Sequence, residues 1–131
     1  MIGIDIIEVS RIESGIKEYG DILTDRIFTA SEIEYCFSFN NPYERFAGKF
    51  AAKEAVFKAL KLEGSSSLLR EIEIQNDSVG APSVRFGDSL KDYRDLVVNI
   101  SISHTEAQAV SVAMIGTANK VFSNPKMIMK Q

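Results

Sequence analysis

The sequence predicts an α+β fold in which an antiparallel sheet packs against one long central helix. Residues 1–8 have the branched apolar composition of a strand, and helical periodicity then dominates up to about residue 60. From residue 72 to residue 115 the pattern changes to strands. Strands and helices therefore do not alternate as they would around a parallel sheet, and no G-x-G-x-x-G or Walker motif is present.

Two capping signals place the first helices. Ser10 and Glu13 have the spacing of a capping box, so the first helix is expected to begin there and to end near Gly20. Thr29 and Glu32 repeat this spacing and predict a short second helix. At both positions a hydroxyl would accept a backbone N–H bond that the first turn of a helix leaves unsatisfied.

The third predicted helix is the longest. Asn41 and Pro42 give it an N-cap and a proline at the first helical position, and alanines recur along it. Basic side chains occur every fourth residue and form a ridge, which consists of Arg45, Lys49 and Lys53. Such a ridge is usually a solvated helix face. Further lysines on the same helix favour a second interpretation, in which it faces an anionic partner.

The second half of the chain is expected to consist mostly of strands. They are predicted at 72–75, 82–86, 97–103 and 107–115, with a short helix at 88–95. Turn-forming residues separate the first two strands. The last two strands read as a hairpin around His104, Thr105 and Glu106.

Composition narrows the class of protein. The chain has 131 residues, of which 45% are hydrophobic and 25% charged, as in an ordinary globular domain. We predict a single domain at 1–115 and treat 116–131 as a C-terminal extension without an assigned role. A formal net charge of −3 argues against general nucleic-acid binding.

Cysteine and histidine each occur once. Cys36 alone cannot form an internal disulfide, and a single histidine excludes a multi-histidine zinc site. No apolar run approaches membrane-spanning length, and the start of the chain lacks the basic region of a signal peptide. We therefore expect a cytoplasmic protein without a membrane partner.

Two carboxylates interrupt otherwise apolar segments. Asp5 stands in the first strand, and Glu54 stands in the third helix, one turn before Lys58. Burying a carboxylate is costly unless a cation or hydrogen bonds compensate it. If the two acids meet, they suit a hard divalent cation that holds a phosphate group, or an acid/base pair. Taken singly, Asp5 reads as a turn former and Glu54 as half of a helix ion pair with Lys58.

Ser103 and His104 lie at the end of a predicted strand. Adjacent strand residues point to opposite faces, so these two do not form a nucleophile–base pair, and no G-x-S-x-G motif exists. With Thr105 they are either a turn with a satisfied histidine or a cluster of phosphate-binding groups.

Four segments together resemble the holo-acyl-carrier-protein synthase family, the small class of 4′-phosphopantetheinyl transferases. They are Ile2–Asp5 followed by Arg11, Phe50–Ala55 followed by Lys58, Asn76–Pro82, and Ile100–Thr105. The resemblance covers about residues 2 to 115. It implies the fold of that family and a homotrimer with each active site at a subunit boundary.

The resemblance also implies the chemistry. Coenzyme A would donate its 4′-phosphopantetheine group to a serine of an apo acyl carrier protein, and adenosine 3′,5′-bisphosphate would be released. Magnesium would be bound by Asp5, Glu54 and the pyrophosphate of coenzyme A, while Lys58 would stabilise the departing phosphate. For the general base, Glu54, Asp5 through a water, and an acid of the carrier protein all stay open, with His104 a weaker candidate.

Further contacts follow from the same resemblance. Arg11 would grip the acidic recognition helix of the carrier protein. The residues that the resemblance implies for coenzyme A binding are Gly80, Pro82, Ser103, His104 and Thr105. Lys49 and Lys53 of the basic ridge are expected to bind coenzyme A as well, because the basic helix favours an anionic partner. One departure from the family pattern is that Leu60–Glu63 delays the glycine after the long helix, so the loop over the nucleotide is expected to differ in length.

Two other interpretations differ in class. A non-catalytic coenzyme A or nucleotide-binding module would bind the ligand without transferring a group. A purely structural oligomer would use its acids and lysines as ion pairs, so that replacing Glu54 would change stability and not nucleotide affinity.

Overall fold

The computed structural model describes residues 1–118, so most of the predicted extension at 116–131 lies outside the described residues. The elements, in chain order, are the strand β1 (Ile2–Glu8), the helices α1 (Val9–Tyr19), α2 (Asp21–Ile27), α3 (Ala30–Phe37) and α4 (Pro42–Ala59), the 3₁₀ helix η1 (Ser66–Glu71), the strands β2 (Ile72–Asn76) and β3 (Pro82–Phe86), the 3₁₀ helix η2 (Asp88–Tyr93), and the strands β4 (Val97–His104) and β5 (Gln108–Gly116).

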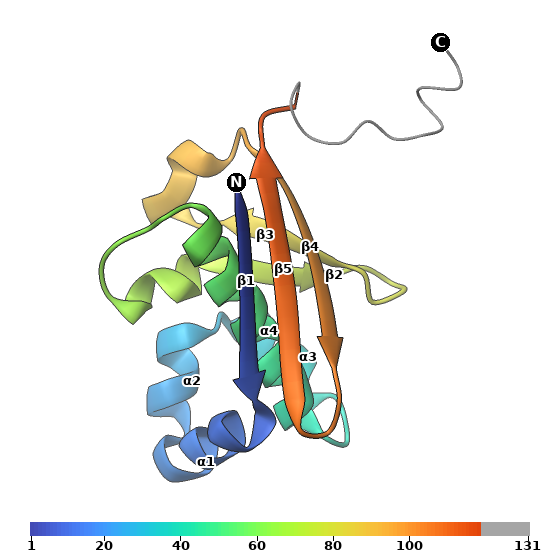
Figure 1. Ribbon diagram of the computed structural model, residues 1–131. Helices are drawn as coiled ribbons and strands as arrows, with labels where there is room; N and C mark the ends of the chain where they lie inside the picture. Colours follow the sequence, from blue (N-terminus) through green and yellow to red (C-terminus); the bar gives the residue numbers. More distant parts are fainter. Residues whose placement is uncertain (119–131) are drawn as a thin grey trace.

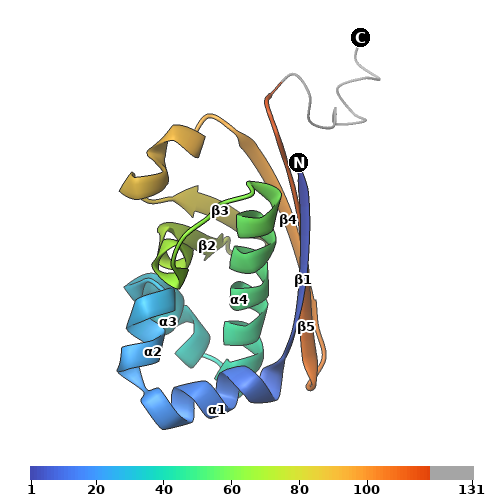
Figure 2. The ribbon, with the colours of Figure 1, turned by 60° about the vertical axis from the view of Figure 1, so that its left-hand side comes forward.

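The predicted α+β fold with a long central helix is confirmed (Figure 1). Its strands, however, form two sheets and not one. A three-stranded antiparallel sheet has the order β1-β5-β4, and β2 and β3 form a separate two-stranded sheet. Figure 2 shows α4 between the three-stranded sheet on one side and α3 with the β2–β3 hairpin on the other.

Helix α4 is covered on both sides, which explains its composition. Small side chains let the neighbouring strands approach its backbone closely. The buried residues of α4 include Phe46, Ala47, Gly48, Ala51, Ala52, Ala55, Val56 and Ala59. The basic ridge is not a solvated face, because Lys49 is only 4% exposed and Lys53 is 0% exposed.

Strand β1 lies directly on α4 at Gly3. A Cβ atom at this position would be 2.0 Å from the carbonyl oxygen of Ala55 and 2.8 Å from the backbone nitrogen of Ala59. Only glycine allows this approach. The contact also fixes the distance between α4 and Asp5, which lies two residues further along the same face of β1.

We expect Gly3→Ala to destabilise the fold by about 1–3 kcal/mol, because the new methyl group would clash with helix backbone that cannot move aside. The measurement is the urea unfolding free energy. Gly20→Ala is a useful comparison, since a Cβ atom at Gly20 meets nothing within 4 Å and only its positive φ of 54° opposes the change. A smaller loss for Gly3→Ala than for Gly20→Ala would contradict the close packing of β1 on α4.

The N-terminal helices differ in part from the sequence prediction. The capping box of Thr29 and Glu32 is present. Helix α1 instead begins at Val9 after Glu8, which places Ser10 inside the helix, so its predicted capping box is wrong. Helix α2 was not predicted. It follows directly after Gly20, which bends the chain, and it buries little besides Thr24 and Ile27.

The predicted hairpin of β4 and β5 is present, β2 and β3 form a second hairpin, and both position candidate site residues. The β2–β3 pair places Asn76 opposite Pro82, next to the turn that contains Gly80. The β4–β5 pair places His104 opposite Ala109 at its closed end. Among the described residues, no helix is long and apolar enough to cross a lipid bilayer.

Candidate functional site

An acidic cluster forms where β1 meets α4. The Lys58 ammonium lies 2.9 Å from Oδ1 of Asp5 and donates a second hydrogen bond, of 3.1 Å, to the carbonyl oxygen of Ile4. The Asp5 side chain is 14% exposed and that of Lys58 is 53% exposed, so this pair can still meet a ligand. The structure therefore brings Asp5 and Lys58 together, although 53 residues separate them.

Glu54 belongs to the same cluster. Burial raises the pKa of its carboxyl group, the negative charge of Asp5 raises it further, and Lys58 lowers it. This mutual influence shows that the two carboxylates lie within electrostatic reach of each other. One lysine cannot balance both, so the cluster favours another cation.

The donor set of the cluster suits magnesium. Carboxylate oxygens are hard ligands, and magnesium commonly takes one or two of them and completes its shell with water and substrate phosphate. Within residues 1–118, no three acidic, histidine or cysteine side chains gather in a way that could hold a metal ion. If magnesium binds here, Asp5 and Glu54 would be its two protein ligands, and water or substrate would fill the remaining positions.

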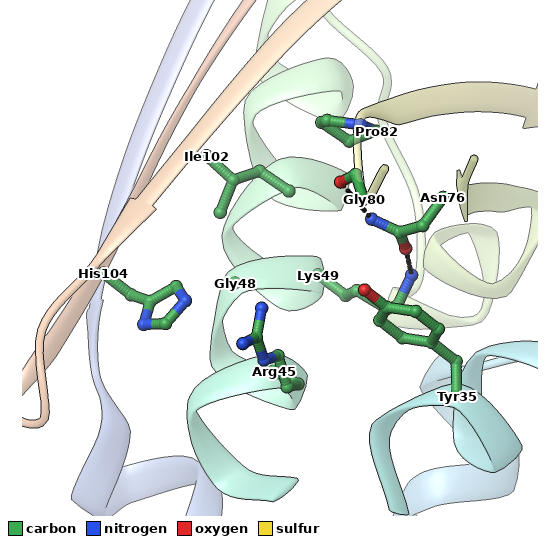
Figure 3. Close-up of a pocket in the computed structure, with 9 residues that line it drawn as sticks. All are labelled: Tyr35, Arg45, Gly48, Lys49, Asn76, Gly80, Pro82, Ile102 and His104. Atoms are coloured by element: carbon green, nitrogen blue, oxygen red, sulfur yellow. Dashed lines mark hydrogen bonds between the residues drawn. The ribbon is translucent and has the colours of Figure 1, made fainter. Parts of the chain in front are cut away.

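A pocket of about 110 Å³ lies between α4, β4 and the β2–β3 turn (Figure 3). Four of the residues predicted to bind coenzyme A line it: Lys49, Gly80, Pro82 and His104. The remaining lining residues, which the sequence analysis did not select, are Tyr35, Arg45, Gly48, Asn76 and Ile102. Four separate segments, which are α3, the first half of α4, the β2–β3 turn and the end of β4, thus form one concave surface.

The pocket carries positive charge. The Lys49 ammonium donates to the Ile74 carbonyl oxygen at 2.7 Å and to Oδ1 of Asn76 at 2.6 Å, and it lies 4.5 Å from the centre of the Tyr35 ring. Burial lowers the pKa of Lys49. Arg45 adds a second cation beside the pocket. A cationic concave surface of this kind suits an anionic ligand with a planar group.

His104 points into the pocket from the end of β4 (Figure 3). Its Nδ1 atom lies 3.5 Å from Oε2 of Glu44, near the start of α4. The side chain of Ser103 is exposed on the opposite face of the strand, and the Thr105 hydroxyl accepts the backbone N–H groups of Ala107 and Gln108 within the turn. Neither of them lines the pocket.

Lys53 lies in neither cluster. Its ammonium is buried against Glu32 at 2.8 Å and donates to the carbonyl oxygens of Leu69 at 2.9 Å and Ile72 at 2.7 Å. These three acceptors use all three of its protons. The sequence did not reveal this role of Lys53, because the capping box already explains why Glu32 stands at its position. The distant partners of Glu32, which are Lys53 and the backbone N–H of Ile74, become visible only in the folded structure.

The two clusters occupy opposite edges of the three-stranded sheet. Asp5 lies on β1 and His104 on β4, with β5 between these strands. Arg11 is exposed on α1, away from the pocket lining.

Comparison with known proteins agrees with this arrangement. Residues 1–115 match the family model of the 4′-phosphopantetheinyl transferase superfamily. A holo-(acyl-carrier-protein) synthase of Ruminiclostridium cellulolyticum is 41% identical over 121 residues, which cover 88% of this chain and 90% of that protein.

Solved structures show the same fold. A holo-(acyl-carrier-protein) synthase from Helicobacter pylori, in complex with coenzyme A, matches with a TM-score of 0.76 and 32% identity over 88% of this chain and 100% of the other. That from Bacillus anthracis, in complex with CoA (3′,5′-ADP), matches with a TM-score of 0.74 and 32% identity, covering 89% and 96%.

The chain therefore belongs to the 4′-phosphopantetheinyl transferase superfamily. Within it, the identity to curated relatives along most of their length places the chain in the holo-(acyl-carrier-protein) synthase family.

Proposed function

We propose that this protein transfers the 4′-phosphopantetheine group of coenzyme A to a serine of an apo acyl carrier protein and releases adenosine 3′,5′-bisphosphate. The observation that carries the proposal is the pairing of Asp5 with Lys58 beside Glu54, in a chain that also has a cationic pocket. Such a combination suits phosphoryl transfer, in which positioning and neutralisation of charge supply most of the catalysis.

Each group then has a part in the reaction. The serine oxygen forms a bond to the phosphorus that carries the pantetheine arm, and the bond from this phosphorus to the bisphosphate oxygen breaks. The serine proton passes to a general base, for which Glu54, Asp5 through a water and an acid of the carrier protein are the candidates. Lys58 would stabilise the negative charge that gathers on the departing phosphate. Asp5 and Glu54 would hold magnesium, which when bound supplies positive charge to the phosphates of coenzyme A.

The pocket would hold the nucleotide part of coenzyme A. Lys49 and His104 offer donors for phosphate or ribose oxygens, and Gly80 and Pro82 form the wall for adenine. Ser103 at the end of β4 and Thr105 in the β4–β5 turn are exposed, and they would bind phosphate or ribose groups outside this pocket. For Lys53 we propose a structural role in place of coenzyme A binding, since all three of its protons are donated to protein acceptors and none is left for a ligand.

We further propose a cytoplasmic homotrimer with active sites between subunits. On the outward face of the three-stranded sheet, Ile2, Ile4 and Ile6 are 67%, 63% and 61% exposed, and such an apolar patch favours a protein partner. Association would also bring the acidic cluster of one subunit towards the pocket of another. Sedimentation should give about three times the chain mass of 14.5 kDa, and a strictly monomeric species would refute this assembly.

The decisive experiment is incubation with coenzyme A, magnesium chloride and an apo acyl carrier protein, followed by intact mass spectrometry. We expect the carrier mass to rise by one phosphopantetheine group, and removal of magnesium by a chelator to stop the increase. An unchanged carrier, in an assay where a known transferase modifies it, would remove the proposed function. Tight coenzyme A binding without transfer would favour a non-catalytic module.

Arg11 is proposed to contact the carrier protein through its exposed position on α1. Arg11→Glu should weaken binding of the carrier protein and make this binding less sensitive to salt concentration, because an attractive charge becomes repulsive. The affinity for coenzyme A should stay the same. The readout is the KM for each substrate. Lys91→Glu on η2 changes the net charge equally and serves as the control. A similar loss for both substrates would contradict the assignment.

A further inference from the structure

Asn76 connects the cationic pocket to the turn of the β2–β3 hairpin. Its Oδ1 atom accepts a hydrogen bond of 2.6 Å from the Lys49 ammonium, and its Nδ2 atom donates one of 3.1 Å to the carbonyl oxygen of Gly80 (Figure 3). An ammonium can only donate and a carbonyl can only accept, so one orientation of the amide satisfies both partners. Asn76 therefore fixes the helix side of the pocket to its hairpin side.

Lys49 is a buried cation of an uncommon kind. Its residue is 4% exposed, yet among the described residues no carboxylate forms an ion pair with it. Its partners are the Ile74 carbonyl oxygen, the Asn76 amide and the Tyr35 ring, all of which are neutral. Lys53, one turn along α4, is by contrast neutralised by Glu32.

This arrangement keeps the positive charge of Lys49 available. Two of its three protons are used by Ile74 and Asn76, which leaves one for an oxygen of a ligand. A buried charge that is held by neutral groups favours an incoming anion. A carboxylate at position 76 would accept the same lysine proton but would cancel the charge.

The hairpin turn is held in shape on its other side. The Asp77 carboxylate accepts the backbone N–H groups of Val79 and Ala81, both at 2.9 Å, and Gly80 adopts a positive φ of 87°. The bond from Asn76 to the Gly80 carbonyl then sets the position of this turn relative to α4. Movement of the turn would displace Gly80 and Pro82, which both line the pocket.

We propose that Asn76 is a positioning residue for the nucleotide part of coenzyme A. It holds the Lys49 ammonium and the Gly80 carbonyl at a fixed separation, and its neutral amide preserves the charge that attracts the phosphate. The identity of the ligand rests on the proposed function. The role of Asn76 in binding an anionic nucleotide is testable without the carrier protein.

The experiment compares Asn76→Asp with Asn76→Ala by calorimetric titration of the full chain with adenosine 3′,5′-bisphosphate. Asn76→Asp should bind about 10- to 100-fold more weakly, because the new carboxylate pairs with Lys49 and loses the donor to Gly80. Asn76→Ala removes both hydrogen bonds without adding a charge and should bind about 3- to 10-fold more weakly. The control is Ser78→Ala in the same turn, which should bind as the wild type does.

The order of the two variants separates positioning from a structural role. A structural role predicts that Asn76→Ala is the worse variant, because Asn76→Asp still accepts the Lys49 proton. For both variants we expect the KM for coenzyme A to rise with the loss of affinity, while the KM for the carrier protein and the melting temperature of Asn76→Asp stay near wild type. Asn76→Ala provides the test of position 76 if Asn76→Asp does not fold.

Several results would overturn the inference. Bisphosphate binding within about 2-fold of wild type for Asn76→Asp would do so, as would a greater loss for Asn76→Ala than for Asn76→Asp. A wild-type protein that binds the bisphosphate and transfers nothing would refute the proposed function and leave the role of Asn76 in nucleotide binding supported. A wild-type protein that binds no bisphosphate would refute both.

Discussion

Glu54→Gln is expected to lower kcat/KM for phosphopantetheine transfer by about 10²- to 10⁴-fold and to raise the magnesium requirement, since a bound metal ion supplies several kcal/mol of charge stabilisation and Glu54 is one of its two proposed ligands. Glutamine keeps the size of the side chain and removes only the charge. Burial and Asp5 both raise the pKa of Glu54, so its ionised form is less favoured in the folded chain than in the unfolded one. Stability at neutral pH should therefore stay the same or increase slightly.

This opposite effect on rate and stability makes the test specific. The measurements are initial rates across a magnesium titration and the thermal midpoint of the same preparation. Glu63→Gln, at an exposed position shortly after α4, is the matched control and should change neither. Asp5→Asn should resemble Glu54→Gln in rate. Wild-type magnesium dependence in both variants would refute the assignment of Asp5 and Glu54 as metal ligands.

Lys53→Met is expected to destabilise the fold by about 3–5 kcal/mol, the usual cost of breaking a buried ion pair by removing one partner. The side chains of Lys53 and Glu32 are both 0% exposed and lie 2.8 Å apart. Without the ammonium, the Glu32 carboxylate would remain buried with only backbone donors. The carbonyl oxygens of Leu69 and Ile72 would lose their partner as well.

Urea unfolding measures this loss, with Lys91→Met on the exposed η2 as a control that should stay within about 0.5 kcal/mol. The double variant Glu32→Gln with Lys53→Met should regain part of the stability, because no isolated charge is then buried. If Lys53 instead binds coenzyme A, Lys53→Met should leave the stability near wild type and raise the KM for coenzyme A. That result would contradict the structural role of Lys53.

Much of the fold could be predicted because its signals are local. The capping box of Thr29 and Glu32 involves groups three residues apart, and Pro42 marks the first turn of α4 by its own geometry. Alternating side chains likewise identified β2, and strand-like composition identified the other strands of both hairpins. The second sheet and α2 were missed, since strand order depends on distant pairing and α2 carries few buried side chains.

The candidate site was predictable only in part. The unusual apolar setting of Asp5 and Glu54 identified the acidic cluster, because a carboxylate there needs compensation. The sequence pattern that includes Asn76 did not assign it a role, and no local pattern selected Tyr35. The position of both residues in the pocket depends on contacts of the β2–β3 hairpin and α3 with α4.

By itself, the sequence determined the family of this protein, the kind and order of most of its helices and strands, and the two acids that we propose as metal ligands. Only the tertiary structure decided which groups surround the charge of each lysine on α4. In sequence these lysines look alike, yet Lys49 meets neutral acceptors, Lys53 meets a buried glutamate and Lys58 meets Asp5. Spacing along one helix cannot reveal this difference, because the free energy of a charge is set by the distant segments that fold against it.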